Sequence, residues 1–342
     1  VLNDLTEVLT WYLDTYITNT TKCSTSIRAK TYIKLTQKYI LSGHTNWVWG
    51  VAFAPRGRFL VSVSTDKTIR VWDYLSGKEV RRFPSIRVSG DEKFCVAFHP
   101  SGRFLATGNL NGAICLWRGT TGKGQRILQE KKWGQRNGIS RLFFDNQALI
   151  SVSLDGIVTF WDIGKEESVK AIEGYDLAAI NPNHTLIASR VSGGIDVSIL
   201  PDQETLYTIE DNTIVSELLF CPNGQLLASG DNDGVVQLWD AKTGEPIHWL
   251  EGHMNTVSSL AFNASGDILA SGSNDKTVTL WDVIKGQELQ SIKIPDRVLS
   301  LAFSADGNYL AAGVGHDSKD PFDYSLESSI YLWKIEHDQV NA

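Results

Sequence analysis

The sequence lacks the patterns that would indicate a metal centre, a membrane span or a familiar catalytic site. Its four cysteines have no paired spacing for zinc or redox chemistry, and we expect neither a metal nor a cofactor. No apolar run is long enough to cross a membrane, and no signal peptide is recognisable, so we expect no membrane insertion. A net charge of −7 argues against a general nucleic-acid binder.

Short runs of alternating apolar and polar residues fill most of the chain. The clearest stretch is residues 252–293, in which four such runs are separated by turn residues. Period-two alternation in runs this short is typical of half-buried β-strands. We therefore expect this stretch to form a four-stranded antiparallel meander.

The same meander occurs again at residues 43–83, with Gly-His near its start and Trp-Asp closing its third strand in both copies. A repeat of about 40 residues with these two dipeptides is similar to the WD40 repeat of β-propellers. The resemblance covers roughly residues 31–335 and implies a propeller fold. It implies much less about function, because propellers serve many roles.

The number of blades follows from the tryptophan near the end of each third strand. The gap from Trp161 to Trp239 is too long for one repeat, and Ile199 stands where a further tryptophan would be. We predict an all-β propeller of seven four-stranded antiparallel blades, with a degenerate fourth blade. The blades are expected at about 43–83, 84–130, 131–173, 174–211, 212–251, 252–293 and 294–335.

The two ends of the chain do not fit the repeat. Residues 36–42 alternate like a strand without a blade of its own, and the last blade lacks a confident fourth strand. We expect these ends to pair and close the ring, which removes exposed sheet edges. Residues 1–30 form an extension to the propeller domain at 31–342, with a predicted short helix that either packs on the rim, binds a partner or ends an upstream domain. The chain is thus open to being one domain of a longer protein.

A polar set recurs in two blades. The resemblance implies a buried tetrad in which the carboxylate accepts from imidazole, imidazole from a hydroxyl, and the hydroxyl from an indole. A hydroxyl held under an indole has no access to substrate, so this role is favoured over hydrolase chemistry. Blades four and seven keep least of the set, and we expect them to be the least rigid. The tetrads are His44, Ser62, Asp66 and Trp72 in blade one, and His253, Ser271, Asp275 and Trp281 in blade six.

The strongest candidate for a binding site is the pair Trp47 and Trp49. Both lie beside the channel on the face that carries the blade-to-blade connections, which is called the top face in this family. Aromatic residues are enriched among those that carry binding energy. We expect an apolar patch over blades one to three, or else packing of these rings between blades. The expected partner-binding residues are Trp47, Trp49, Thr65, Phe94, Leu110, Leu154, Asn232, Asn274 and Arg297.

Two loops add further candidates on the top face. Residues 131–136 are basic and aromatic, and either receive an acidic or phosphorylated segment or form a solvated loop. An insertion in blade seven, near residues 314–328, is either a flap that contacts a partner or a plain decorated loop.

Together these patterns predict a non-catalytic, cytoplasmic scaffold or sensor module that binds a protein or peptide on its top face. The alternative is a small-ligand sensor at the channel mouth, which would need a deep pocket with convergent polar groups. The repeats also resemble those of large multidomain proteins, in which such a propeller is the sensor of a signalling ATPase. An enzyme is the third hypothesis, but no catalytic site is recognisable.

Overall fold

The computed structural model describes residues 31–83, 93–123, 126–129, 137–144, 148–200, 203–211, 213–316 and 327–339. The chain divides into two units, residues 34–336 and residues 1–33 with 337–342. The helix predicted within residues 1–30 lies outside the described residues, as do residues 131–136 and most of the insertion in blade seven.

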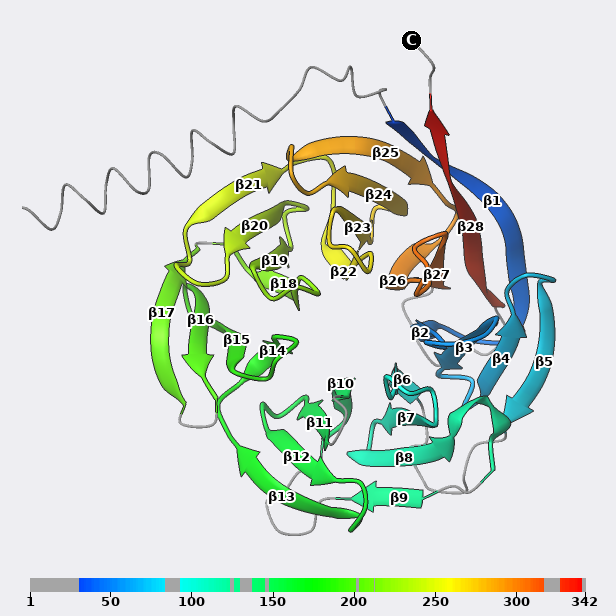
Figure 1. Cartoon of the computed structure of the whole chain (residues 1–342), viewed down its shortest axis with the longest axis horizontal. Coiled ribbons are helices and arrows are strands. Elements are labelled where there is room, and N and C mark those ends of the chain that lie inside the picture. The colour runs from blue at the N-terminus through cyan, green and yellow to red at the C-terminus, as the bar shows by residue number, and fades with distance from the viewer. Residues whose placement is uncertain are drawn as a thin grey trace, which may run out of the picture. The chain divides into compact units, whose positions relative to one another are not determined.

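The sheets of the larger unit are arranged around a central axis, each with the first strand of its meander innermost (Figure 1). Blade one contains β2 (Val48–Phe53), β3 (Phe59–Ser64), β4 (Ile69–Asp73) and β5 (Lys78–Phe83). Blade two contains β6 (Lys93–Phe98), β7 (Phe104–Asn109), β8 (Ala113–Arg118) and β9 (Arg126–Gln129). Blade three contains β10 (Ile139–Phe144), β11 (Ala148–Ser153), β12 (Val158–Asp162) and β13 (Glu167–Ile172).

The next three blades repeat this order, and the last differs. Blade four contains β14 (Asp176–Ile180), β15 (Leu186–Val191), β16 (Gly194–Ile199) and β17 (Glu204–Glu210). Blade five contains β18 (Val215–Phe220), β19 (Leu226–Asp231), β20 (Val236–Asp240) and β21 (Pro246–Leu250). Blade six contains β22 (Val257–Phe262), β23 (Ile268–Ser273), β24 (Thr277–Asp282) and β25 (Gln287–Lys293). Blade seven has the order β1-β28-β27-β26, from β1 (Thr31–His44), β26 (Arg297–Phe303), β27 (Tyr309–Gly315) and β28 (Ser328–Gln339).

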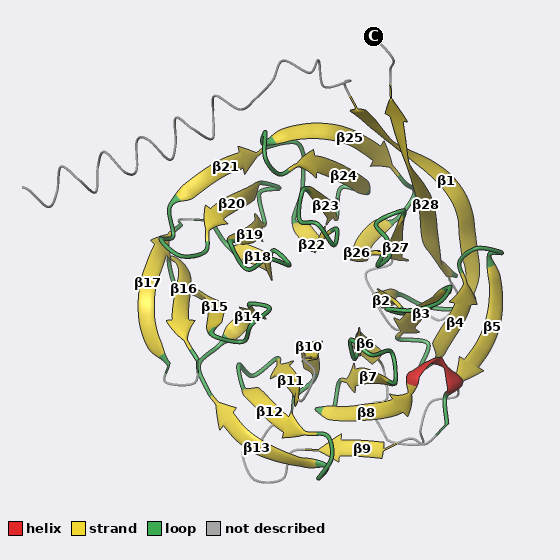
Figure 2. Cartoon of the chain, viewed as in Figure 1, coloured by secondary structure: helices red, strands yellow, loops and turns green. Residues whose placement is uncertain are grey.

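The prediction of seven four-stranded antiparallel blades is confirmed. The degenerate fourth blade forms all four of its strands, with Ile199 at the end of its third. Among the described residues the only helix is a short 3-10 turn, η1 (Gly119–Thr121), between β8 and β9 (Figure 2).

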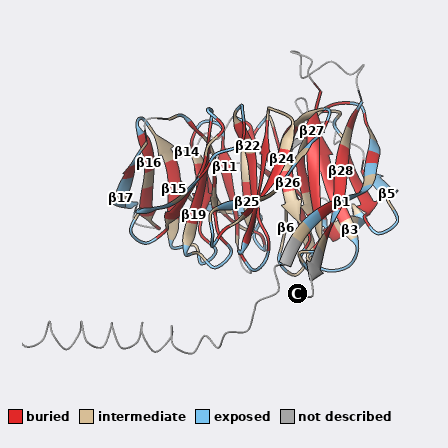
Figure 3. Ribbon diagram, turned by 90° about the horizontal axis from the view of Figure 1, so that it is seen from above, coloured by how far each residue is buried: buried red, intermediate tan, exposed pale blue. Residues whose placement is uncertain are grey.

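The core lies between neighbouring blades. Second strands such as β23 are buried along their whole length, whereas a fourth strand such as β5 is exposed at all but one residue (Figure 3). Each hydrophobic cluster joins two adjacent blades, and Trp281 of blade six packs with Leu238 of blade five. Because each blade packs against a neighbour on both sides, the ring buries both faces of a second strand at once.

Candidate partner-binding site

In blade one, four buried side chains form a continuous chain of hydrogen bonds. The imidazole of His44 lies between Asp66 and Ser62, with both nitrogens 2.7 Å from an oxygen atom. The indole Nε1 of Trp72 donates to the Ser62 hydroxyl at 2.9 Å. These bonds connect the end of β1 to β3, to β4 and to the turn between them.

The ionisation of this set follows from its burial. Burial lowers the pKa of His44, and this effect outweighs the hydrogen bond and charge of Asp66, which raise it. The ring is therefore neutral, donates from Nδ1 to Asp66 and accepts at Nε2 from Ser62. Burial raises the pKa of Asp66, but the hydrogen bonds from His44 and Thr68 outweigh it and bring the pKa to about 2.

Blade six contains the same arrangement. The Nε2 atom of His253 is 2.7 Å from the Ser271 hydroxyl, which accepts from Trp281 at 2.7 Å. The Nδ1 atom of His253 lies 3.2 Å from Asp275, which in turn accepts a bond from the backbone N–H of Met254. Both serine hydroxyls are fully buried and engaged on two sides, so they cannot act as nucleophiles.

The other blades keep part of the set. The indole-to-hydroxyl bond recurs from Trp117 to Thr107, from Trp161 to Ser151 and from Trp239 to Ser229, at 2.8 to 3.1 Å. Blade four has no tryptophan at this position, although Ser189 is present and buried. The indole donor and the hydroxyl acceptor therefore occur together in five blades. Blade four has the hydroxyl but not the indole.

Trp47 and Trp49 lie together at the end of the strands predicted as the top face. Their ring centroids are 5.4 Å apart, and Trp47 also makes an edge contact with His316 of blade seven at 5.6 Å. Gly315 permits this contact, because a Cβ atom there would lie 3.0 Å from the Trp47 ring. Both indole rings are partly buried rather than mostly exposed.

A cavity of about 220 Å³ lies beside the two rings. Asn274 and Arg297 line it with them, so four of the predicted partner-binding residues meet in one place. Trp47 contributes a buried Nε1–H that has no hydrogen-bond partner among the described residues. The residues that line the cavity are Trp47, Trp49, Ser258, Asn274, Arg297, Leu299 and Gly315.

The remaining predicted residues lie elsewhere. Thr65 is buried, and its backbone N–H donates to the Trp47 carbonyl at 3.1 Å. Leu154 and Asn232 are exposed, Leu110 is partly buried, and none of them lines the cavity. The side chain of Phe94 lies outside the described residues. The structure thus joins the tryptophan pair to blades six and seven. The sequence predicted either an apolar patch over blades one to three or packing of these rings between blades.

Comparison with known proteins agrees with the propeller fold. A family model described as "WD domain, G-beta repeat" matches residues 35–73, 85–118, 203–240, 244–282 and 286–320, more than half of the chain. The chain belongs to the WD40 repeat family. The residues between 118 and 203, which hold blade three and most of blade four, fall outside the matched segments of this WD40 propeller.

Individual relatives match short parts of the propeller. A stretch of 38 residues is 63% identical to nuclear distribution protein PAC1 of Yarrowia lipolytica, covering 11% of this chain and 9% of that protein. CCR4-associated factor 4 of Saccharomyces cerevisiae is 33% identical over 122 residues, 36% of this chain and 17% of that protein. Anaphase-promoting complex subunit cdh1 of Dictyostelium discoideum is 31% identical over 117 residues, 32% and 14% respectively. The matches span less than a fifth of each of these relatives.

The WD40 propeller has a second cavity, of about 310 Å³, along its central channel. Trp49, Ser258 and Leu299 line both this cavity and the one at the top face. Inside the channel Arg141 of blade three pairs with Glu217 of blade five at 2.5 Å. Burial raises the pKa of Glu217 more than Arg141 lowers it. Sequence reasoning missed this pair, although charged residues inside two innermost strands were a visible signal.

Metal-ligating side chains, helices and cysteines can each be located in the described part of the WD40 propeller. Within it, no group of three histidine, cysteine or carboxylate side chains is placed to hold a metal ion. In the same residues no helix has the length and apolar character needed to cross a membrane. The three cysteines at positions 95, 115 and 221 are buried thiols.

Proposed function

We propose that this WD40 propeller is a non-catalytic protein-interaction module that binds a partner at the cavity beside Trp47 and Trp49. The observation that carries this proposal is the convergence of two partly buried tryptophans with Asn274 and Arg297. Tryptophan and arginine are the residue types that most often dominate binding energy, and they do so in pockets that exclude water. The partner is a protein or peptide, and a cytoplasmic location and the lack of nucleic-acid binding stay predictions.

The size of the cavity favours a side chain of a larger partner over a free small ligand. Pockets that enclose small molecules usually measure about 300 to 1,000 Å³. The cavity of about 220 Å³ is smaller than this. The Nε1–H of Trp47 is buried and has no partner among the described residues, so a change of the Trp47 ring on binding would let it donate to an acceptor on the partner. The names of two relatives describe a factor associated with CCR4 and a subunit of a complex, which agrees with a scaffold role.

Affinity capture from a lysate of the source organism tests this proposal. The wild type should retain a partner that a Trp47→Ala/Trp49→Ala double variant loses, once circular dichroism and melting show that the variant is folded. Trp249→Ala is the matched control, because Trp249 is 55% exposed on the outer strand of blade five. Equal retention by all three proteins would contradict the proposed site.

Two further variants define the extent of the site. Arg297→Ala should weaken capture, because Arg297 lines the cavity, and Leu154→Ala should not, because Leu154 is exposed outside it. If Leu154→Ala reduced capture as much as Arg297→Ala, the site would extend over blades one to three as the sequence predicted.

A further inference from the structure

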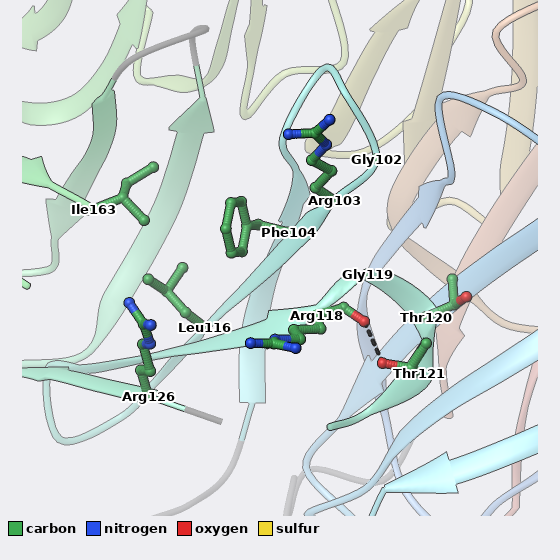
Figure 4. A pocket seen from close by; sticks show the side chains of 10 residues that line it. All are labelled: Gly102, Arg103, Phe104, Leu116, Arg118, Gly119, Thr120, Thr121, Arg126 and Ile163. Atoms are coloured by element: carbon green, nitrogen blue, oxygen red, sulfur yellow. Dashed lines mark hydrogen bonds between the residues drawn. The ribbon is translucent and has the colours of Figure 1, made fainter. Parts of the chain in front are cut away.

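A larger cavity, of about 540 Å³, lies at the opposite end of the strands, where blade two meets blade three. Its walls come from the start of β7, the end of β8, η1 and the start of β9, together with Ile163 after β12 (Figure 4). This volume lies within the range of about 300 to 1,000 Å³ that is typical of ligand sites.

The cavity is strongly basic. Arg103, Arg118 and Arg126 line it, and no acidic residue does. In Figure 4 the side chains of Arg118 and Arg126 both extend toward Leu116. Arg126 pairs with Glu166 at 2.8 Å, but both side chains are nearly half exposed, and such pairs contribute little. Neither Arg103 nor Arg118 has an ion-pair partner among the described residues. Within the described part of the chain, the charge of the cavity is therefore largely unneutralised.

Blade one has an ion pair at this position. There Arg58, just before the second strand, pairs at 3.2 Å with Asp73 at the end of the third strand. The strand registers are equivalent, with Phe59 opposite Asp73 and Phe104 opposite Arg118. Arg103 therefore corresponds to Arg58, and Arg118 corresponds to Asp73. Blade two replaces an arginine–aspartate pair with two arginines.

The replaced aspartate has a structural role in other blades. Asp73, Asp162, Asp240 and Asp282 each accept bonds from backbone N–H groups two and three residues later. Arg118 cannot accept such bonds, and its turn is the 3-10 segment η1 instead. Relative to blade one, blade two thus gives up a turn-stabilising acceptor and an ion pair, and gains a second cation, Arg118. An anionic ligand would compensate for this loss.

The floor of the cavity is apolar. Leu116 and Ile163 are buried, and Phe104 is partly buried beside them. A ligand that combined an anionic group with an adjacent apolar side chain would satisfy both the arginines and the floor. Arginine binds phosphate and carboxylate through paired N–H donors, and a phosphate carries about two negative charges at neutral pH.

We propose that this cavity is a second binding site of the propeller, which takes a phosphorylated peptide segment. The phosphate lies against Arg118 and Arg126, and a neighbouring apolar side chain of the peptide packs on Phe104. These two arginines suit a dianionic phosphate better than a single carboxylate. The net charge of −7 disfavours the alternative source of phosphate, an anionic membrane surface.

The binding test uses an oriented library of short peptides, each with one fixed central phosphothreonine, beside the same library without phosphate. The wild-type chain should retain the phosphorylated library at least tenfold more strongly, and millimolar inorganic phosphate should compete. Equal retention of both libraries would overturn the proposal. Retention of vesicles containing phosphorylated lipid headgroups, without retention of phosphopeptides, would also overturn it.

The decisive variant is Arg118→Asp, which restores the blade-one arrangement. It should reduce phosphopeptide retention at least tenfold while the melting temperature stays unchanged or rises. Arg58→Gln is the matched control, because Arg58 is an exposed arginine at the equivalent place in blade one, and it should retain the library. If Arg118→Asp did not fold, Arg126→Gln would take its place. Undiminished retention by these cavity variants would contradict the site.

This proposal does not rest on the tryptophan site. The Trp47→Ala/Trp49→Ala variant should bind phosphopeptides as the wild type does, and Arg118→Asp should keep the partner captured at the top face. A phosphopeptide lost with the tryptophans and kept by Arg118→Asp would assign phosphate recognition to the top face and overturn the second site.

Discussion

Blades six and four have the same four antiparallel strands but are held together by different interactions. In blade six, an indole, a hydroxyl, an imidazole and a carboxylate link the middle strands to the connection that precedes β22. In blade four the strand register places Ser198 at the tryptophan position, so the prediction of Ile199 there was wrong by one residue, and the blade has no equivalent histidine. Its innermost strand contributes the buried residues Ala178 and Ala179, and Arg190 donates to the Val215 carbonyl of blade five at 2.8 Å.

This difference distinguishes the interactions that form a blade from those that hold its strands more rigidly. Strand pairing and apolar contact with two neighbours suffice for blade four, because the ring buries both of its faces. The tetrad of blade six adds a set of buried polar groups whose members depend on one another, since removal of one leaves the others unpaired. The two blades should therefore respond differently to equivalent changes.

The largest difference is expected from removal of the shared hydroxyl. Ser271→Ala would leave the Trp281 indole and the His253 imidazole without their buried partner, at a cost of about 2 to 4 kcal/mol in the free energy of unfolding. Ser189→Ala in blade four, where no indole donates, should cost less than about 1 kcal/mol. Chemical denaturation of both variants measures the difference, and equal losses would contradict the role given to the tetrad.

Acid should weaken the tetrads before it affects blade four. Burial lowers the folded-state pKa of His44 and of His253 below 6.5, so the folded protein binds fewer protons than the unfolded chain as the pH falls below that value. Stability from this source is complete above pH 6.5 and declines toward the lower folded pKa. Asp66, with a pKa of about 2, adds a further loss as the pH falls from 3.8.

Replacement of both imidazoles tests this pH dependence. A His44→Gln/His253→Gln variant should be less stable than the wild type at pH 8, but should lose less stability between pH 7.5 and pH 5.5. Thermal melting across this range provides the measurement. An identical pH dependence in both proteins would show that other groups control acid sensitivity.

The smallest expected effect is a difference in hydrogen-exchange rate between the blades of the unmodified protein. Amides of blade four, and of blade seven where Ala312 replaces the hydroxyl, should exchange with solvent faster than those of blade six, because fewer side chains lock their strands. Hydrogen exchange measured by mass spectrometry compares β15 and β16 with β23 and β24 directly. Equal protection would mean that ring packing alone determines rigidity.

The number of blades could be predicted because each blade is a local unit. Alternation, turn residues and the third-strand tryptophan recur within about 40 residues, and Leu186 to Ile199 kept the alternation even where the tryptophan was missing. The prediction ended blade seven at about residue 335, whereas its strand β28 continues to Gln339. Its polar sequence past Trp333 gave no apolar signal for this extension.

The candidate sites were less predictable, because they depend on contacts between blades. Trp47 and Trp49 were visible as surplus aromatics, but Gly315 and His316, which lie against Trp47, come from the other end of the chain. Nothing near Trp47 in the sequence shows that blade seven covers it. The replacement of aspartate by Arg118 was visible in the aligned repeats, but its meaning required the ion pair of blade one.

The tilted contact between Trp47 and Trp49 also has a spectroscopic consequence. Two indoles whose centroids lie 5.4 Å apart at an interplanar angle of 49° couple their electronic transitions, and such coupling produces paired bands of opposite sign in ultraviolet circular dichroism. A molecule that entered the adjacent cavity and changed this angle would change the bands. The protein therefore carries an intrinsic optical reporter of occupancy at its own candidate site.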